Sequence, residues 1–409
     1  MKITVMKFGG TSVADPEKIQ RAAERAIAER RKGYAVVVVV SAPGEMTDEL
    51  ITLAERITPN PDDRELDQLV TTGEQVGISL FAMACNARGA PAISLTGPQA
   101  GIDAVGAAGR AQIRRIRTRN ILKHLREGRI VSVAGFQGLA PNGDTATLGR
   151  GGSDLTAVAL ASALKTGRCE IFSDVKGVYT ADPRIVHDAR KLRKISFEEM
   201  LELAGAGAQV MQARSMEVAE RFGVELHVRS AFHNQRGTWV IAQGDKMLEK
   251  AFVSSLALDK SEVRLTIVGV PDQPGVAATV LSTLAADSIP VDMIIQSAPS
   301  HTGVNDMSFM TPKSYAVKAK KALEAAARRL RAERVDLNDQ VAKVSAVGTG
   351  FRHSPKIAAT MFETLAKLKI NIHMISASDL RVSCVVDLKD GENALRGLHK
   401  AYNLSRGKN

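Results

Sequence analysis

Short apolar runs alternate with longer segments of helical periodicity over the first 245 residues or so. Residues 3–6 read as a strand, and residues 35–40 form an uninterrupted apolar run, which is typical of a strand covered on both faces. Residues 16–32 between them carry helical periodicity, opened by Asp15 and closed by Gly33. The same reading places strands at 92–95, 113–116, 130–134, 170–173 and 224–229, and helices at 63–86, 119–127, 154–164 and 197–204. This alternation predicts an α/β fold with a mostly parallel sheet and helices on both faces.

The pattern changes near residue 246, where two segments of roughly 70 residues look like copies of one unit. Each copy reads as a strand, a turn with proline, a helix, two strands and a helix, which is a ferredoxin-like order. The predicted elements are 263–270, a helix to 286, 290–296, 305–311 and a basic helix to 330, then 341–347, a helix to 368, 370–376, 381–388 and 392–402. The alternative is two unrelated α+β segments. We therefore expect three domains, at 1–245, 246–335 and 336–409.

The charge balance is the unusual feature of the composition. Lys plus Arg is 55 against 44 for Asp plus Glu, so the formal net charge is +11. Such a balance is typical of proteins that bind nucleic acid, anionic membranes or small anions. Aromatic residues make up only 4% of the chain, too few for a base-stacking platform, which favours a small anion. Eight basic residues fall within 110–129 beside one acid, Glu127, so most of the excess is expected on a solvated face.

Cysteine usage and the apolar runs indicate the compartment. The three cysteines, Cys85, Cys169 and Cys384, are widely spaced, which argues against a disulfide framework or a CxxC metal site. The N-terminus leads into a strand without a signal-peptide pattern, and the longest apolar run, 35–40, is too short for a membrane helix. We expect a cytoplasmic protein that binds neither a membrane nor nucleic acid.

Two glycine-rich segments each lead into a helix. Residues 7–12 (KFGGTS) follow the first strand, so their backbone N–H groups can meet an anion beside the charge of Lys7. They match neither GxxxxGK[ST] nor GxGxxG, and an ordinary turn is the alternative. In residues 147–154 (TLGRGGSD), Ser153 or Asp154 suits the helix N-cap, and Arg150 suits a carboxylate or phosphate. The alternative there is a capped helix with a flexible lead-in.

Two further segments carry candidate ligand groups. Residues 173–184 follow a strand, and ligands bind at the carboxyl ends of parallel strands, so Tyr179 suits an adenine ring and Arg184 a phosphate. Ordinary loop chemistry is the alternative. Residues 71–75 interrupt a helical stretch, and Glu74 there is a candidate to bind a substrate ammonium. The alternative is that Glu74 faces solvent, as most lone glutamates on helices do. No HExxH, catalytic-triad context or HRD/DFG pair occurs, which argues against zinc hydrolysis and eukaryote-type protein kinase chemistry.

In this order, segments 7–12, 72–74, 135–138, 149–154 and 173–184 closely resemble the aspartate kinases of the amino-acid kinase superfamily. The resemblance spans the whole chain, and the C-terminal duplication is similar to that family's paired ACT regulatory domains. It implies a three-layer α-β-α amino-acid kinase domain followed by two ferredoxin-like ACT domains. It also implies ATP-dependent phosphorylation of the β-carboxylate of L-aspartate to 4-phospho-L-aspartate, the committed step toward lysine, threonine and methionine. ATP and Mg²⁺ would be the cofactors, with no metal site of the protein's own.

The resemblance also assigns site residues in four groups. The catalytic pair is Lys7 and Asp154. The substrate group is Ser41, Thr47, Glu74, Arg150 and Ser153. The nucleotide group is Lys7, Phe8, Gly9, Gly10, Gly151, Gly152, Ser173, Asp174, Tyr179, Arg184 and Gln209. The effector group, for lysine, threonine or both at an interface between two copies, is Asp272, Pro274, Gly275, Val276, Ala277, Gln296, Asn371 and Ile372. Such an interface requires a homodimer or an α2β2 assembly, and in some relatives a shorter second subunit starts at a position like Met247.

Three positions depart from the family pattern. Gln209 stands where a Lys usually contacts the ATP phosphates, so either another base such as Arg214 substitutes or turnover is slow. Gly77 stands where a small hydroxyl residue is common, and Lys356 where Gly is usual. The alternatives to an aspartate kinase are an amino-acid kinase acting on a glutamate-like carboxylate, a ligand-sensing pseudokinase and, last, a nucleic-acid-binding protein.

Overall fold

The computed structural model describes residues 1–149, 151–208, 211–242, 252–296, 303–349, 351 and 354–405. They form two compact units. The first comprises the described residues of 1–178, 191–204 and 209–245, and the second those of 179–190, 205–208 and 246–409. Within these ranges no helix combines the length and apolarity that crossing a membrane requires.

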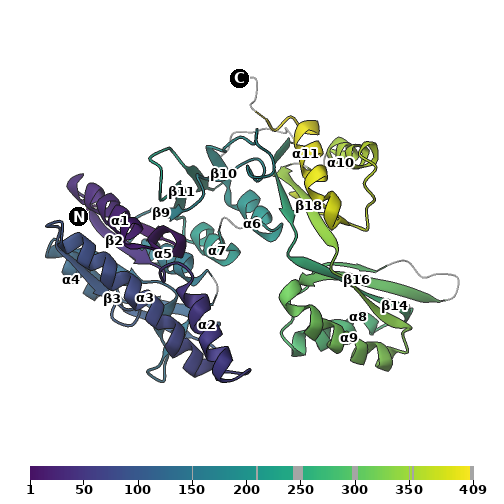
Figure 1. Ribbon diagram of the computed structural model, residues 1–409, viewed down its shortest axis with the longest axis horizontal. Helices are drawn as coiled ribbons and strands as arrows, with labels where there is room; N and C mark the ends of the chain where they lie inside the picture. The colour runs from purple at the N-terminus through teal and green to yellow at the C-terminus, as the bar shows by residue number, and fades with distance from the viewer. Residues whose placement is uncertain are drawn as a thin grey trace. The chain divides into compact units, whose positions relative to one another are not determined.

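An eight-stranded sheet forms the centre of the first unit (Figure 1). Its strands are β1 (Ile3–Phe8), β2 (Ala35–Val40), β3 (Ala92–Leu95), β6 (Ile130–Ala134), β9 (Arg168–Ser173), β10 (Lys194–Ser196), β11 (Glu225–Ser230) and β12 (Thr238–Ile241), in the order β10-β12-β11-β9-β1-β2-β6-β3. Every neighbouring pair is parallel except β11 with β12. The predicted mostly parallel sheet is therefore confirmed.

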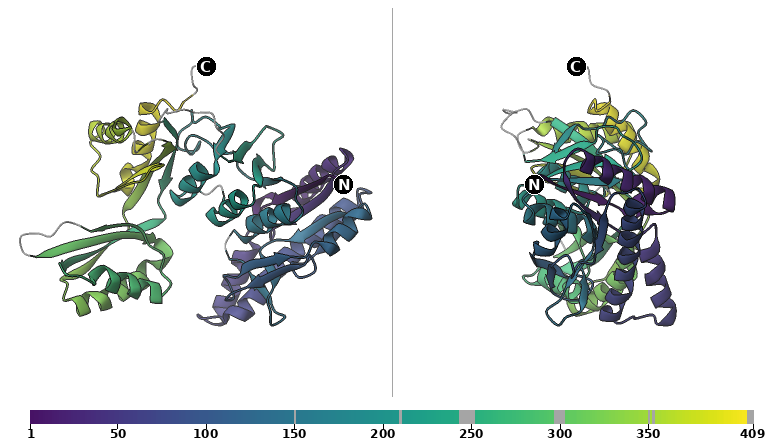
Figure 2. Two further views of the ribbon diagram at one scale, coloured as in Figure 1. Left: turned by 180° about the vertical axis from the view of Figure 1, so that it is seen from behind. Right: turned by 90° about the vertical axis from the view of Figure 1, so that its left-hand side faces the viewer.

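Helices cover both faces of this sheet. Its helices are α1 (Pro16–Arg31), α2 (Met46–Ile57), α3 (Asp63–Asn86), α4 (Arg119–Arg126), α5 (Gly152–Ala163), α6 (Phe197–Gly205) and α7 (Ala213–Arg221). On one face, Met6, Phe8 and Val38 pack with apolar side chains of α1 and α3, which lie side by side (Figures 1 and 2). The alternate positions, such as Val37 and Val39, are equally buried on the other face, where α5 contacts β1, β2 and β9. The unit is thus the expected three-layer α-β-α arrangement.

A smaller sheet in the same unit carries the basic stretch. It consists of β4 (Ile102–Val105), β5 (Gln112–Ile116), β7 (Gln137–Leu139) and β8 (Thr145–Thr147), with β5 at its edge. All eight basic side chains of 110–129 are exposed, on or near β5 and α4. Arg115 and Arg117 pair with Asp103 at 3.3 and 2.6 Å. The predicted solvated basic face is confirmed.

The second unit contains two four-stranded sheets, each with its own helices. One has the order β15 (Asp292–Gln296), β16 (Val304–Pro312), β14 (Glu262–Pro271) and β17 (Arg334–Asn338), and α8 (Val276–Ala286) and α9 (Ala316–Leu330) share its apolar core (Figure 1). The other has the order β13 (Phe252–Asp259), β18 (Val341–Thr349), β20 (Arg381–Asp387) and β19 (Met374–Ala377), with α10 (Pro355–Lys367) and α11 (Gly391–Ala401). The duplicated α+β units are confirmed.

The two sheets are interleaved along the sequence. Strand β13 precedes the first copy but pairs with β18 of the second copy in register from Phe252 with Thr349 to Asp259 with Lys343. A buried ion cluster also joins the sheets, because Lys343 of β18 contacts Glu262 of β14 at 2.8 Å and Asp292 of β15 at 2.6 Å. Burial disfavours the charge of Lys343, but the two carboxylates outweigh it and raise its pKa. The boundaries at 245 and 335 stay predictions.

Candidate functional site

Four neighbouring strands of the large sheet end at one edge. Phe8 of β1 lies opposite Val40 of β2 and Phe172 of β9, and Val40 lies opposite Ala134 of β6. The chain runs from β1 through β2 to β6 on one side, whereas β9 lies on the other side of β1. In open parallel sheets, ligands bind at the carboxyl edge beside such a change of direction. The predicted segments 7–12, 135–138 and 173–184 lie at or directly after the ends of these strands, and the predicted substrate residue Ser41 directly follows β2.

The glycine turn after β1 is packed too tightly for any side chain. A Cβ atom on Gly10 would lie 2.8 Å from the Gly44 carbonyl oxygen and 2.9 Å from that of Ala42. Gly44 N–H donates to the Gly10 carbonyl oxygen at 3.0 Å, which fixes the turn against the loop after β2. Phe8, predicted to contact the nucleotide, is fully buried and stacks on Phe172 at 4.7 Å between ring centroids, so its side chain belongs to the core.

Lys7 and Asp154, the two residues predicted to be catalytic, form an ion pair. Lys7 Nζ lies 2.5 Å from Asp154 Oδ1, and both side chains are nearly buried. The pair connects β1 to the first turn of α5, where a carboxylate is also favoured by the helix dipole. Its position at the carboxyl edge, beside Gly9, places one fixed cation where a phosphate group could approach.

The start of α5 differs from the prediction. The N-cap is Gly151 with φ of 74°, in the left-handed region, and no side chain caps the helix, so the expectation of Ser153 or Asp154 as N-cap is wrong. A side chain at Gly151 would collide with Gln212, which packs against it. Gly152 and Asp154 are therefore first-turn residues. Both predicted glycines lie at the helix N-terminus, a position that suits an anion.

Glu74 lies within a continuous α3, so the predicted interruption at 71–75 is wrong. Its side chain is buried, Oε1 accepts a 3.3 Å hydrogen bond from Ala42 N–H, and Oε2 has no hydrogen-bond partner. Burial raises the Glu74 pKa to about 7, and the hydrogen bond from Ala42 only partly opposes the shift. Gly77 admits the loop after β2, since a Cβ atom there would lie 2.5 Å from Ser41 O. A ligand cation at Oε2 would satisfy this carboxylate.

The remaining predicted substrate residues lie around the same edge. Ser153 is buried against Gly135, where a Cβ atom would lie 2.5 Å from Ser153 Oγ. Ser41 directly follows β2, and its N–H donates to the Phe8 carbonyl oxygen at 3.1 Å. Thr47 lies in the first turn of α2, which starts four residues after Ala42. Arg150 lies outside the described residues.

The predicted nucleotide residues beyond β9 divide between the two units. Ser173 and Asp174 belong to the first unit, where Ser173 Oγ donates to Asp174 Oδ1 at 2.9 Å. Tyr179 and Arg184 belong to the second unit. Burial raises the Tyr179 pKa, and Arg184 forms a bidentate contact with Asp182, which lowers the Asp182 pKa. Gln209 lies outside the described residues.

Segment 179–190 is tied into the second unit by side chains from α11 and beyond. Thr180 Oγ1 lies 2.9 Å from His399 Nε2, and Ser405 Oγ donates to Asp188 at 2.5 Å. Ala181 and Val186 join the apolar core that α10 and α11 share. A segment predicted to line the nucleotide is therefore held by the second unit.

The predicted effector residues occupy three places in the second unit. Asp272, Pro274, Gly275, Val276 and Ala277 lie at the start of α8, Gln296 ends β15, and Asn371 with Ile372 precede β19. Gly275 is the left-handed N-cap of α8, with φ of 96°. Asn305 Nδ2 donates to Asp272 Oδ1 at 3.2 Å, while the buried Asn305 Oδ1 lacks a hydrogen-bond partner. Lys356 is exposed in the first turn of α10.

Sequence reasoning missed Asp67, a buried carboxylate on α3 seven residues before Glu74. The available signal was its spacing, because two carboxylates two helical turns apart lie on one helix face. Among the described residues, no group of three or more His, Cys, Asp or Glu side chains could hold a metal ion.

Comparison with known proteins places this site in a family. Residues 2–230 match the sequence profile of the amino acid kinase family, and residues 265–326 and 344–402 match that of the ACT domain. An aspartate kinase of Pseudomonas putida is 46% identical over 404 residues, which cover 99% of this chain and 98% of the relative. The chain belongs to the aspartate kinase family. Membership confirms the family resemblance and the predicted enzyme class.

Solved structures of aspartate kinases have the same fold. E. coli aspartokinase III in complex with aspartate and ADP is 27% identical and gives a TM-score of 0.81 over 98% of this chain and 99% of that chain. The same enzyme in complex with lysine and aspartate gives a TM-score of 0.78 at 27% identity, over 99% of this chain and 100% of that chain. The aspartate kinase fold, with its kinase domain and ACT units, thus extends over nearly the whole chain.

Proposed function

We propose that this protein transfers the γ-phosphoryl group of ATP to the β-carboxylate of L-aspartate, giving 4-phospho-L-aspartate and ADP. The observation that carries the proposal is the buried Glu74 carboxylate, whose Oε2 has no hydrogen-bond partner, at the edge of the sheet that also holds the Lys7–Asp154 pair. An α-ammonium group would satisfy that oxygen. The aspartate and ADP bound to the E. coli relative support the same pair of ligands.

The nucleotide end of the site supplies charge and backbone donors. Phosphoryl transfer depends mainly on positioning the reactants and on neutralising the charge that develops on the transferred group. Lys7 provides a cation that Asp154 holds in place. In the turn after β1, Gly9 N–H donates to the Phe172 carbonyl oxygen at 3.4 Å, so Gly10 is the proposed backbone donor to a phosphate oxygen. Gly151 and Gly152 lie at the start of α5, where Gln212 packs against Gly151 and Gly152 N–H donates to the Gly149 carbonyl oxygen at 2.9 Å. They stay in the proposed nucleotide group by their place at the helix N-terminus. Ser173, Asp174, Tyr179, Arg184 and Gln209 complete the proposed nucleotide group.

Mg²⁺ fits this site only as a companion of ATP. The described residues offer no set of three or more ligating side chains, whereas Mg²⁺ in kinases is commonly held by one or two carboxylates together with substrate phosphates. Asp154 is a buried carboxylate at this edge of the sheet, and the charge of Lys7 already neutralises it. Bound with the nucleotide, Mg²⁺ would neutralise phosphate charge.

The acceptor end orients aspartate rather than activating it. The β-carboxylate of free aspartate has a pKa of about 3.9 and is already ionised at neutral pH, so no general base is needed. One carboxylate oxygen forms the new bond to the γ-phosphorus while the bond from that phosphorus to the bridging oxygen of ADP breaks. Glu74 would bind the ammonium, with Ser41, Thr47, Arg150 and Ser153 around the rest of the substrate. Ionised Glu74 is the form that attracts the ammonium.

The proposal also includes feedback inhibition by an amino acid, an oligomeric state and a cellular location. Lysine, threonine or both would bind the effector residues at an interface between two chains, as a homodimer or an α2β2 assembly, and inhibit the first step toward lysine, threonine and methionine. The E. coli relative binds lysine in a T-state structure, which supports an amino-acid effector. A ligand that prefers one conformation shifts the population toward it. The three cysteines are free and buried, which is consistent with the cytoplasm as the proposed location.

A coupled ADP-release assay with L-aspartate, L-glutamate and N-acetyl-L-glutamate tests the proposal. The expected result is turnover with aspartate alone at millimolar concentration. Turnover with a glutamate-like substrate instead would assign another amino-acid kinase activity. Binding of ATP and aspartate without turnover would favour a ligand-sensing pseudokinase, the alternative suggested by Gln209 at the position of the usual Lys. The inhibition panel adds lysine, threonine and methionine, singly and in pairs.

A further inference from the structure

Two loops of the first unit lie against each other just before α5. Ala111 N–H donates to the Thr147 carbonyl oxygen at 3.0 Å, which joins segment 107–111 to the end of β8. Two residues later, a Cβ atom on Gly149 would lie 3.0 Å from the Gly109 carbonyl oxygen. Residue 149 leads by chain continuity into 150–154, the segment that contains Ser153 and Asp154. Whatever fixes these two loops also fixes the approach to α5.

Asp67 of α3 binds both loops through their donors. Its Oδ1 accepts from Thr147 Oγ1 at 2.6 Å, its Oδ2 accepts from Thr147 N–H at 2.8 Å, and both oxygens lie 3.0 Å from Gly109 N. The side chain is 3% exposed. A buried carboxylate is costly unless donors satisfy it, and here the backbone and hydroxyl of just two residues supply them.

Arg214 of α7 binds the same two loops through their acceptors. Its Nη1 donates to the Leu148 carbonyl oxygen at 2.8 Å and its Nη2 to the Ala111 carbonyl oxygen at 2.9 Å. The Asp67 carboxylate thus accepts hydrogen bonds from these two loops, and the Arg214 guanidinium donates hydrogen bonds to the same two loops. These two contacts also direct the Arg214 guanidinium to backbone carbonyls, which argues against its serving as the substitute phosphate ligand for Gln209.

We propose that Asp67 and Arg214 are positioning residues for aspartate binding, an inference that rests on the proposed function. Asp67 and Glu74 lie seven residues apart on one face of the unbroken α3. The helix therefore sets the separation between the carboxylate that would bind the substrate ammonium and the loop that leads to Ser153. Loosening the loop changes that separation and leaves the glycine turn after β1 in place, although it also reaches Asp154, the ion-pair partner of Lys7.

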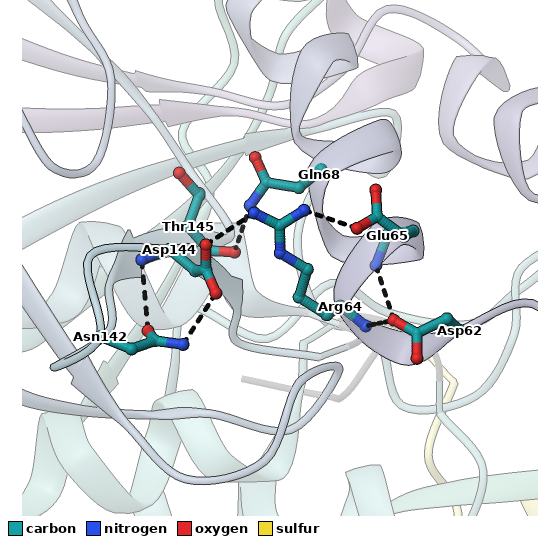
Figure 3. Close-up of polar contacts among 7 residues, drawn as sticks. All are labelled: Asp62, Arg64, Glu65, Gln68, Asn142, Asp144 and Thr145. Carbon is teal, nitrogen blue, oxygen red and sulfur yellow. Dashed lines mark hydrogen bonds and ion pairs between the residues drawn. The ribbon is translucent and has the colours of Figure 1, made fainter.

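An exposed network on the same helix and hairpin provides a matched control (Figure 3). Arg64 Nη2 donates to Asp144 Oδ1 at 2.8 Å, and Gln68 Nε2 donates to the Thr145 carbonyl oxygen at 3.3 Å. Asp144 also accepts from Asn142 Nδ2 at 2.7 Å. These contacts also join α3 to the β7–β8 hairpin, but at its solvent-exposed end. Exchanging Asp for Asn at 144 makes the same chemical change as at 67, away from the start of α5.

The experiment compares steady-state kinetics of the full-length chain and its variants. Asp67→Asn places an amide group against the donors of Gly109 and Thr147. Arg214→Gln replaces the guanidinium by a shorter, neutral side chain. A misplaced reactant can cost on the order of 10- to 100-fold, so each variant is expected to raise the KM for aspartate by about that factor. The KM for ATP is expected to rise less than the KM for aspartate, because Lys7 and the glycine turn after β1 are not held by Asp67 or Arg214, whereas Gly151 and Gly152 at the start of α5 follow the loop. Asp144→Asn is expected to leave both KM values within about twofold of wild type.

A pair of substitutions at Thr147 decides the question if Asp67→Asn does not fold. Thr147→Val replaces the hydroxyl that donates to Asp67 and is expected to raise the KM for aspartate. Thr147→Ser keeps that hydroxyl and is expected to have the wild-type KM for aspartate. Folded variants with an unchanged KM for aspartate, or with both KM values raised equally, would overturn the positioning role and leave the proposed function intact. A wild-type protein that does not phosphorylate aspartate would overturn the proposed function and this inference with it.

Discussion

Replacing Glu74 with glutamine is expected to remove a pH-dependent loss of stability from the first unit. Glu74 is 3% exposed and receives one hydrogen bond, and burial raises its pKa from 4.5 to about 7. A carboxyl group whose pKa is raised by folding contributes a stabilisation that is fully present below the pKa of the unfolded chain. That stabilisation is lost as the pH rises from about 4.5 through about 7, because the unfolded chain ionises more readily than the folded one.

The size of the effect follows from the two pKa values. Each pKa unit corresponds to about 1.36 kcal/mol. Between about pH 5 and about pH 8, linkage lowers the wild-type free energy of unfolding by roughly 2–3 kcal/mol relative to Glu74→Gln. Any pH-independent effect of the amide cancels in this comparison. The buried carboxylate thus destabilises the ligand-free protein at neutral and alkaline pH, which is expected of a group placed for a charged ligand.

Urea unfolding at the two pH values measures this difference. The chain contains a single tryptophan, Trp239 in β12, so its fluorescence reports the first unit. Glu55→Gln, at an exposed position on α2, is the control and is expected to match wild type at both pH values. Equal pH dependence of wild type and Glu74→Gln would refute the reasoning, because the Glu74 carboxyl would then ionise in the folded protein as it does in the unfolded chain.

Four further changes test other parts of the account. Lys7→Gln removes the buried cation and is expected to lower kcat by roughly 10²- to 10³-fold, measured at saturating ATP and aspartate. Gly10→Ala forces a Cβ atom against two carbonyl oxygens and is expected to raise the KM for ATP by about tenfold, more than the KM for aspartate. Lys343→Met leaves the largely buried Glu262 and the partly exposed Asp292 without their cation, so calorimetry of the full-length chain should record a loss of about 3 kcal/mol, recovered when Glu262 and Asp292 are neutralised as well. Gln209→Lys is expected to raise kcat, and an unchanged kcat would show that the missing cation is not limiting.

The hydrophobic pattern predicted the main elements because the buried segments are sharply bounded. The strands at 35–40, 92–95 and 130–134 and the helix at 63–86 match the structure at both ends. Helix α2 was missed although Met46, Leu50, Leu53 and Ile57 recur at helical spacing, and none of its residues is buried. Strands of three or four residues, such as β7 and β8, are too short for a periodicity to be recognised.

Tertiary contacts decided what the sequence could not. The N-cap of α5 is a left-handed glycine because Gln212, distant in the sequence, occupies the space a side chain would need. Glycine at position 73 did not break α3, since it packs against Ala42, where a Cβ atom would lie 2.9 Å from the alanine methyl. From the sequence alone, Asp67 looks like an ordinary solvated helix residue, because its partners Gly109 and Thr147 are distant in the chain. The pairing of β13 with β18 likewise joins strands that no local pattern connects.

Trapping the acyl phosphate with hydroxylamine tests the central claim most directly. The purified protein, ATP with Mg²⁺, and L-aspartate are incubated together, and β-aspartyl hydroxamate is identified by mass spectrometry. The account predicts a hydroxamate that requires ATP and aspartate, is not formed from glutamate, and is strongly reduced in Lys7→Gln. ADP release without an aspartyl hydroxamate, or equal product from Lys7→Gln, would contradict the assignment of this edge of the sheet as the site of phosphoryl transfer to aspartate.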